Sequence, residues 1–273
     1  IEHIHDERYE ARYNLQNLNH STMICDAGRP REQLSGRWHF SVDPYETGLR
    51  SDWYKYTPAD LQEKHLPWDY EPEGGDIMNL PSCWNMSRPE FFYYEGSAWY
   101  AREFSYLADV PEKRVFLRIG AANYNAMVFL NHEYLGNHYG GSTPFFVELT
   151  GKLRPEDLIQ ICVNNTRTLD RVPMRNTDWF NYGGIYRDVE LLRVPKDFIK
   201  AFRIALAPHE SFQEILFAVT VSDKTAQDEV RICIPELGVD QVFALKNGKV
   251  EGALTAAPEL WSPDNPKLYD VNV

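Results

Sequence analysis

The chain has 273 residues, 43% hydrophobic and 25% charged, which is enough for two folded domains and excludes a disordered or fibrous protein. Its net charge of −12 argues against a nucleic-acid partner, because an acidic surface repels phosphate groups. No apolar run approaches the roughly 18 residues that a membrane-spanning helix needs, so no membrane partner is expected either.

Cysteine spacing gives no sign of a metal site. Cys25, Cys83, Cys162 and Cys233 lie far apart, without a C-x-x-C pair and without a histidine at zinc-finger spacing. Cys162 and Cys233 lie within apolar strand patterns, where a reduced, buried thiol is the usual state. These observations predict no metal and favour a reducing compartment, the cytoplasm.

The first two thirds of the chain predict an arm followed by a β-sandwich. Residues 1–33 are polar and aperiodic, which indicates an N-terminal arm. From residue 34 onward, apolar and polar residues alternate with period two, and turn residues interrupt the alternation. The strands expected here are 115–119, 126–130, 145–149, 158–163 and 189–194, with turns at 140–142 and 164–165 and a long connection at 57–75. So many short strands predict a jelly-roll sandwich over residues 34–195.

A second domain is expected after Pro195, where one strand ends on a proline and a new alternating run begins. Residues 214–222 and 229–234 each place apolar side chains on one face, as half-buried sandwich strands do. Turns at 247–248 and 263–264 add to a strand density typical of an immunoglobulin-like sandwich. The predicted fold class is therefore all-β, with an immunoglobulin-like domain over residues 196–273.

Motifs of well-known catalytic machinery are absent from the sequence. There is no G-x-S-x-G, no H-E-x-x-H, no Walker loop and no dinucleotide fingerprint, so no cofactor is expected. Forty acidic residues could be paired on paper in many ways, but nothing in the sequence brings two of them to the roughly 5 Å that a retaining glycosidase needs. No catalytic residue is therefore predicted.

The segment 176–189 has the composition of a loop held in a fixed shape. Trp179 and Tyr182 can anchor it or offer a stacking face, Asn181 adds an amide, and Gly183 and Gly184 permit close backbone approaches. Asp178 would then project from a rigid frame. The alternative is a buried structural corner in which Asp178 caps local amides.

Six ordered motifs in this sequence resemble those of β-glucuronidases and β-galactosidases of glycoside hydrolase family two. The segment from Asp178 to Val189 resembles D-x-[FW]-x-x-[AGS]-G-[IL]-x-R-x-V. The other five are L-S-G-R-W-H-F at 34–40, L-P-S-C-W-N at 80–85, G-S-A-W-Y-A-R-E-F at 96–104, the hairpin of 126–145 and L-W-S-P-D-N-P-K-L-Y at 260–269.

The resemblance implies a sugar-binding, galactose-binding-like jelly roll and an immunoglobulin-like domain in front of a (β/α)₈ barrel that carries two catalytic glutamates. By the same resemblance, Asp178 holds hydroxyls of the terminal sugar of a β-glycoside, together with that barrel. Arg187 is expected to be a structural partner. The barrel is expected to be missing from this chain, which should then be inactive by itself, and the parent enzyme is expected to be a homo-oligomer.

The resemblance has one departure from the family pattern and leaves two alternatives open. His132 stands where the family usually has glycine, so Asn131 is expected to carry more of the strain of that turn. The 178–184 segment lies nearer to the glucuronidase version, but both sugars remain possible. A stand-alone carbohydrate-binding or interaction module is the competing reading, because jelly rolls are common lectin scaffolds.

Overall fold

The computed structural model describes residues 18, 23, 25–55, 70, 72, 74–106, 113–169, 172, 174–208, 212–222 and 227–273. The chain divides into two compact units: unit 1 comprises residues 1–22 and 30–193, and unit 2 comprises residues 23–29 and 194–273. Strands dominate both units, which confirms the all-β fold class. Within the described ranges, no helix is long and apolar enough to cross a membrane.

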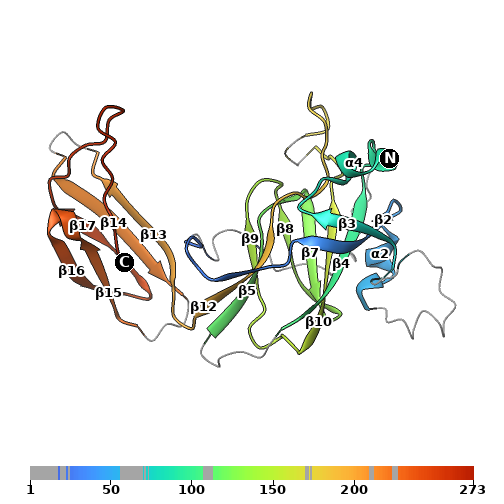
Figure 1. Cartoon of the computed structure of the whole chain (residues 1–273), viewed down its shortest axis with the longest axis horizontal. Helices are drawn as coiled ribbons and strands as arrows, with labels where there is room; N and C mark the ends of the chain where they lie inside the picture. Colours follow the sequence, from blue (N-terminus) through green and yellow to red (C-terminus); the bar gives the residue numbers. More distant parts are fainter. Residues whose placement is uncertain are drawn as a thin grey trace. The chain divides into compact units, whose positions relative to one another are not determined.

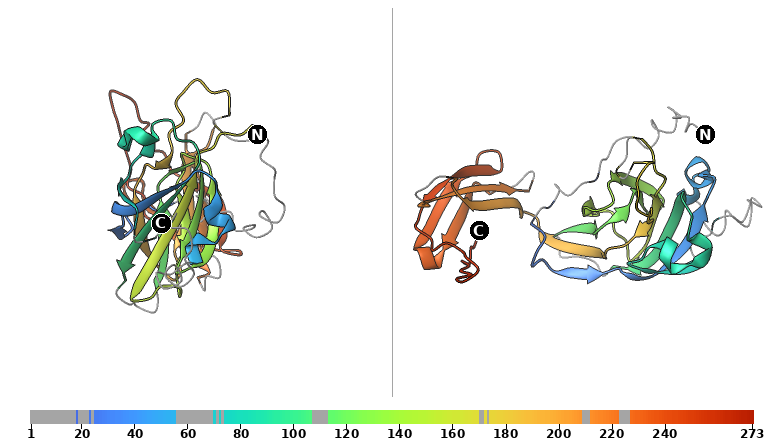
Figure 2. Two further views of the ribbon diagram at one scale, coloured as in Figure 1. Left: turned by 90° about the vertical axis from the view of Figure 1, so that its right-hand side faces the viewer. Right: turned by 90° about the horizontal axis from the view of Figure 1, so that it is seen from above.

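Unit 1 is a β-sandwich built from two sheets (Figures 1 and 2). The larger sheet has the strand order β3-β2-β4-β10-β7-β8, and the smaller has the order β1-β12-β5-β9. The strands of the larger sheet are β2 (Gly36–Asp43), β3 (Asp76–Leu80), β4 (Ser97–Ser105), β7 (Asn125–Leu130), β8 (Glu133–Tyr139) and β10 (Glu156–Asn164). Those of the smaller sheet are β1 (Arg31–Gln33), β5 (Lys113–Ile119), β9 (Phe145–Glu148) and β12 (Val189–Pro195).

Short elements complete unit 1. A separate two-stranded ladder joins β6 to β11, and single helical turns lie between the strands of the larger sheet. These elements are β6 (Ala122–Asn123), β11 (Gly184–Ile185), α2 (Thr47–Arg50), α4 (Trp84–Ser87), η2 (Trp53–Lys55) and η3 (Pro89–Phe91). The α4 and η3 turns and the β6–β11 ladder contain or adjoin the candidate site.

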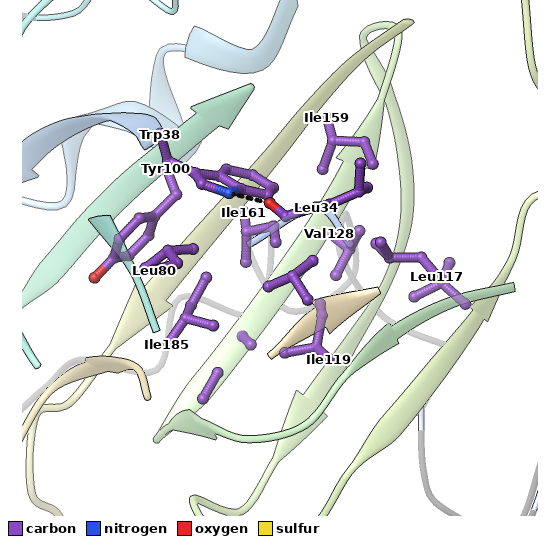
Figure 3. Packing of buried hydrophobic residues seen from close by; sticks show 14 of the residues in the cluster. Leu34, Trp38, Leu80, Tyr100, Leu117, Ile119, Val128, Ile159, Ile161 and Ile185 are labelled. Carbon is purple, nitrogen blue, oxygen red and sulfur yellow. Dashed lines mark hydrogen bonds between the residues drawn. The ribbon is translucent and has the colours of Figure 1, made fainter. Parts of the chain in front are cut away.

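The main core of unit 1 contains apolar residues from both sheets (Figure 3). Ile161 and Val128 of the larger sheet and Leu117 and Ile119 of the smaller sheet are fully buried in it. Trp38 is buried among them, and its indole Nε1 donates a hydrogen bond to the carbonyl of Leu34 at 2.7 Å. The apolar side chains of the strands with the predicted alternation thus point inward and fill the space between the two sheets.

The larger sheet is buried on its other face as well. Every residue of β7 is buried, and its side chains divide between two clusters because successive residues of a strand point to opposite faces. Phe129 stacks on Tyr54, with ring centroids 4.4 Å apart, in a second cluster that is largely aromatic. The members of this cluster are Leu49, Trp53, Tyr54, Tyr70, Trp99, Met127, Phe129 and Cys162. It follows that the helical turns α2 and η2 act as a cover for the sheet.

Unit 2 contains two smaller sheets, of orders β13-β14-β17 and β15-β16. Its elements are β13 (Ile199–Leu206), β14 (Glu214–Val221), β15 (Glu229–Ile234), η4 (Pro235–Leu237), β16 (Val239–Ala244) and β17 (Lys249–Thr255). Phe217, Val219 and Ile232 lie at the centre of its core. Near the end of the chain, Asn272 exchanges two backbone hydrogen bonds of 2.9 Å with Cys233 of β15.

The described residues between 25 and 33 contribute to both units. Arg31–Gln33, which the sequence placed in the arm, forms β1 and pairs with β12. Residues 25–29 belong to unit 2: the Cys25 amide donates to Lys200 O, and the Arg29 guanidinium donates to Ile199 O at 2.8 Å. Most of residues 1–24, and most of the long connection at 57–75, lie outside the described residues.

The turn between β7 and β8 distributes its strain differently from the expectation. Asn131 and His132 both have left-handed backbones, with φ of 48° and 71°, so the strain does not fall mainly on Asn131. The His132 ring Nδ1 lies 2.7 Å from the carbonyl oxygen of Tyr54, a hydrogen bond that holds the histidine in this conformation. At His132, a hydrogen bond between ring and backbone therefore supports a left-handed conformation that glycine would adopt without steric cost.

Candidate functional site

The predicted loop lies at one end of the unit 1 sandwich, beside α4 at the top of Figure 1. It leads from residue 174 into β11, and a second loop, from α4 through η3 to β4, lies next to it. The two loops are joined by hydrogen bonds between residues about a hundred positions apart in the chain.

Gly183 packs where no other residue fits. A Cβ at this position would lie 2.0 Å from Cζ2 of Trp84, whose indole is fully buried. Its backbone amide donates to Oδ1 of Asn85 at 2.7 Å, and its carbonyl accepts from the Trp84 amide at 3.0 Å. The close approach expected of this glycine is thus made against the α4 turn.

Asn85 ties the two loops together. Its carboxamide is buried, with 2% of the residue exposed. While Oδ1 accepts from Gly183, Nδ2 donates to the carbonyls of Phe91, Phe92 and Tyr94 at 3.0–3.1 Å. One side chain therefore satisfies buried polar groups on both loops.

A second buried amide pair holds the loop on its other side. Nδ2 of Asn181 donates to the carbonyl of Asn165 at 2.7 Å, and the Asn165 side chain donates back to Asn181 O at 3.3 Å. Oδ1 of Asn165 also accepts from the Gly96 amide at 2.9 Å. Asn181 and Asn165 are 6% and 1% exposed, so these bonds are shielded from water.

The β6–β11 ladder fixes the end of the loop. Gly184 has φ of 129° and pairs with Asn123, and a Cβ on it would approach the carbonyl oxygen of Ser82 to 2.7 Å. The Asn123 carboxamide also donates to the carbonyl of Tyr182. Side-chain and backbone bonds thus hold residues 181–185 from both sides.

Asp178 is exposed at the head of this framework. Among the residues that the structure describes, its carboxylate has no hydrogen-bond partner and no cation within salt-bridge distance. The expected alternative, in which Asp178 caps amides of its own loop, has no bond in the described part of the chain to support it. The carboxylate is free to accept hydrogen bonds from a ligand.

Aromatic rings gather beside Asp178. Phe180 lies 4.9 Å from Phe92 and 5.0 Å from Tyr182, measured between ring centroids, and Phe92 meets Tyr93 edge to face at 4.8 Å. These four residues are called the aromatic patch below. Trp179 is 62% exposed and makes no ring contact with a described residue.

Arg187 bonds to the turn that follows β8. Its guanidinium Nη1 donates to the carbonyl of Ser142 at 2.9 Å and lies over the ring of Tyr186. Both contacts are with the protein itself, which is what a structural partner would make.

Buried tyrosines under the site are held in their neutral form. Burial raises the pKa of Tyr100, which is fully enclosed beneath Gly184, well above its usual range. Burial, together with nearby Asp43, also raises the pKa of Tyr94, whose hydroxyl donates to the Ser97 carbonyl at 2.6 Å. Neither phenol can act as a base near neutral pH. No cluster of His, Cys, Asp or Glu suited to a metal occurs in the described ranges.

The sequence does not single out Asn85, Asn165 and Asn123 as site-shaping residues. It predicts a turn at Asn164-Asn165, whereas Asn164 is the last residue of β10 and Asn165 is buried. Each amide finds partners far along the chain, and neighbouring residues carry no signal of such a contact. For Asn85 and Asn123 the sequence offers one hint, because each directly adjoins an aromatic residue, Trp84 or Tyr124.

The fold and its loop end define an all-β sandwich domain with a rigid, aromatic-rich edge. Residues 31–195 match the family model described as glycosyl hydrolases family 2, sugar binding domain. The match covers more than half of the chain, and the chain belongs to glycosyl hydrolase family 2.

Relatives with known names support this membership. A β-glucuronidase of Paenibacillus borealis is 27% identical over 90% of this chain and 42% of its own length. A β-galactosidase of Thermoanaerobacter pseudethanolicus is 26% identical over 81% of this chain and 32% of its own length. The chain thus spans well under half of the length of these relatives.

A solved structure shares the fold. The β-glucuronidase of Ruminococcus gnavus in complex with D-glucuronic acid aligns over 94% of this chain and 45% of its own, with a TM-score of 0.70 and 23% identity. At that identity the likeness concerns the fold alone.

Proposed function

We propose that this chain is the non-catalytic front part of a retaining β-glycosidase, in which Asp178 holds hydroxyls of the terminal sugar. The observation that carries the proposal is an exposed carboxylate with no bond to a described residue, next to a framework of buried amides and close-packed glycines. A sugar hydroxyl donating to such a carboxylate makes a charge-assisted hydrogen bond, which is stronger than a neutral one. Trp179, Asn181, Tyr182, Gly183, Gly184 and Arg187 are proposed to shape the loop rather than to react.

The catalytic carboxylates of this enzyme are proposed to lie in a separate barrel domain that completes the sugar pocket. Family membership and the larger size of the named relatives support this division of labour. Jelly-roll and immunoglobulin-like identities are proposed for residues 34–195 and 196–273. Of the arm expected over residues 1–33, residues 25–29 belong to unit 2 and Arg31–Gln33 forms β1. Glucuronide and galactoside both remain candidate substrates, and the relatives include enzymes named for each.

The setting of the enzyme is also proposed from chemistry. All four cysteines are free, which suits the reducing environment of the cytoplasm. A homo-oligomeric parent is proposed by resemblance to the family.

Replacing Asp178 by alanine in the complete enzyme tests the proposal. Removing a hydrogen bond to a charged group costs about 1.5–3 kcal/mol, so kcat/KM on an aryl β-glycoside should fall roughly tenfold to a hundredfold or more. Thermal melting of the 273-residue chain should be unchanged, because no described residue loses a bond. Asp264→Ala, which removes an exposed carboxylate from unit 2, is the control. A destabilised chain with unchanged kinetics would end the substrate-contact role.

A second measurement addresses the division of labour. The 273-residue chain by itself should hydrolyse no aryl β-glycoside at a measurable rate and should bind single sugars weakly or not at all, because its site lacks most of its walls. Millimolar or tighter binding of a monosaccharide would favour the alternative, a stand-alone carbohydrate-binding or interaction module.

A further inference from the structure

Asn165 links the sheet of unit 1 to the loop that carries Asp178. It directly follows β10, and its backbone amide donates to the carbonyl of Gly96, the residue before β4, at 3.2 Å. Its Oδ1 accepts from the Gly96 amide at 2.9 Å, while its Nδ2 donates to the Asn181 carbonyl. The Asn165 carbonyl in turn accepts from Nδ2 of Asn181 at 2.7 Å. Residue 181 is therefore fixed relative to the ends of two paired strands.

Asp178 lies three residues before this anchor. Between them, the Phe180 ring of the aromatic patch packs on the ring of Phe92, with centroids 4.9 Å apart. Asp178 itself makes no hydrogen bond or ion pair with a residue that the structure describes. The position of its carboxylate therefore depends on how the neighbouring residues of the loop are held.

The anchor is internal to unit 1. Asn165 and Asn181 are 1% and 6% exposed, so water does not compete for their bonds. A Cβ on Gly183 would lie 2.6 Å from Nδ2 of Asn165, which shows how closely the loop backbone packs on this amide. Because these contacts are all made within unit 1, they do not depend on what covers the loop end in a larger protein.

We propose that Asn165 is a positioning residue for Asp178, acting through Asn181. This rests on the proposed function, in which the Asp178 carboxylate holds sugar hydroxyls, and deepens it by naming the residue that keeps the carboxylate in place. The strength of a hydrogen bond depends steeply on distance and direction. A displacement of about 1 Å, caused by a change remote from the reacting atoms, can cost an enzyme about a hundredfold in rate. Asn165 is buried and needs no contact with the sugar to have this effect.

A double-mutant cycle in the complete enzyme tests the proposal. Asn165→Ala should lower kcat/KM on an aryl β-glycoside roughly threefold to tenfold, because a displaced carboxylate makes a weaker bond to the sugar. In an Asp178→Ala background the same substitution should have no further effect, because no carboxylate remains to be positioned. A merely structural role would give the same loss in both backgrounds.

Gln160 provides a matched control on the same strand. It is 0% exposed, its Nε2 donates to the Tyr54 carbonyl at 3.1 Å, and its Oε1 accepts from the Tyr70 hydroxyl. Gln160→Ala therefore also removes two buried side-chain bonds of β10, but on the face covered by the second cluster. It should lower the melting temperature comparably to Asn165→Ala and leave kcat/KM unchanged in both backgrounds.

Asn181→Ala is the milder second variant, for use if Asn165→Ala does not fold. It removes the bond to the Asn165 carbonyl and keeps both bonds between Asn165 and Gly96. Its loss of kcat/KM should likewise disappear in the Asp178→Ala background.

The outcomes separate this inference from the proposed function. If Asp178→Ala leaves kcat/KM unchanged, the proposed function fails and the positioning role fails with it. If Asp178→Ala lowers kcat/KM but Asn165→Ala has no effect, or has the same effect in both backgrounds, only the positioning role is overturned. A loss in Gln160→Ala equal to that in Asn165→Ala would assign the effect to general destabilisation and would also overturn it.

Discussion

The interior of unit 1 and the loop end that carries Asp178 are held by different kinds of interaction. In the interior, side chains such as Ile161 and Leu117 are fully buried among other apolar groups. At the loop end, Asn85 and Asn165 each bond to several backbone groups, and Gly183 packs against Trp84. Apolar burial is distributed over many contacts, whereas the loops depend on a few directional bonds.

This difference teaches that the site and the fold can be damaged separately. Loss of apolar volume weakens the whole sandwich, because strands of both sheets share its main core. Loss of a bridging amide frees two loops while the strands keep their ladders. The following substitutions are chosen to break or sharpen that contrast.

The largest effect is expected in the interior. Ile161→Ala should lower the free energy of unfolding of unit 1 by about 2–5 kcal/mol, because it leaves a cavity between the sheets. Ile161→Val, which removes one methylene, should cost only about 0.5–1.5 kcal/mol. Denaturant titration measures both values. Equal losses for the two variants would show that this position is not closely packed.

A smaller and more local effect is expected at the loop end. Asn85→Ala should cost about 2–4 kcal/mol, because an unsatisfied buried donor or acceptor costs about 1–3 kcal/mol and some of the freed groups can reach water. Hydrogen exchange should rise at residues 89–96 and 178–183 while β4, β7 and β10 stay protected. Asn265→Ala, on an exposed turn of unit 2, is the control. Uniform loss of protection throughout unit 1 would contradict the separation drawn above.

The smallest effect is expected at the β7–β8 turn. His132→Gly relieves a left-handed backbone but removes the hydrogen bond to the Tyr54 carbonyl. Each contribution is about 1 kcal/mol and they oppose one another, so stability should change by less than about 1 kcal/mol. A thermal melt of the variant measures the balance. A loss well beyond that range would mean that the imidazole also anchors the η2 cover.

The sequence predicted strands well because their signal is local. The apolar run at 126–130 and the alternation at 229–234 correspond to β7 and β15 almost residue for residue. The run at 126–130 is continuously apolar because β7 is buried on both faces. The aromatic cluster on its second face includes Tyr70. Tyr70 comes from the long connection at 57–75, most of which lies outside the described residues.

The candidate site was only partly predictable. Composition and the family motif singled out the segment 178–187, and the close approach expected of the glycines is present at Gly183. The partners that hold the segment were not visible, since Asn85 lies 98 positions before Gly183. Contacts that close so long a loop depend on the finished fold and leave no periodic pattern.

Unit 2 is discontinuous in the sequence, and this bears on how the chain is made. During synthesis residues 25–29 leave the ribosome first, but their partners on β13, among them Lys200 and Phe202, follow roughly 170 residues later, after all of unit 1. The second unit therefore cannot complete its contacts until residues 25–29 bind to β13, which is synthesised only after unit 1. A clone that starts at residue 196 would express this unit without the Cys25 segment that lines its first strand.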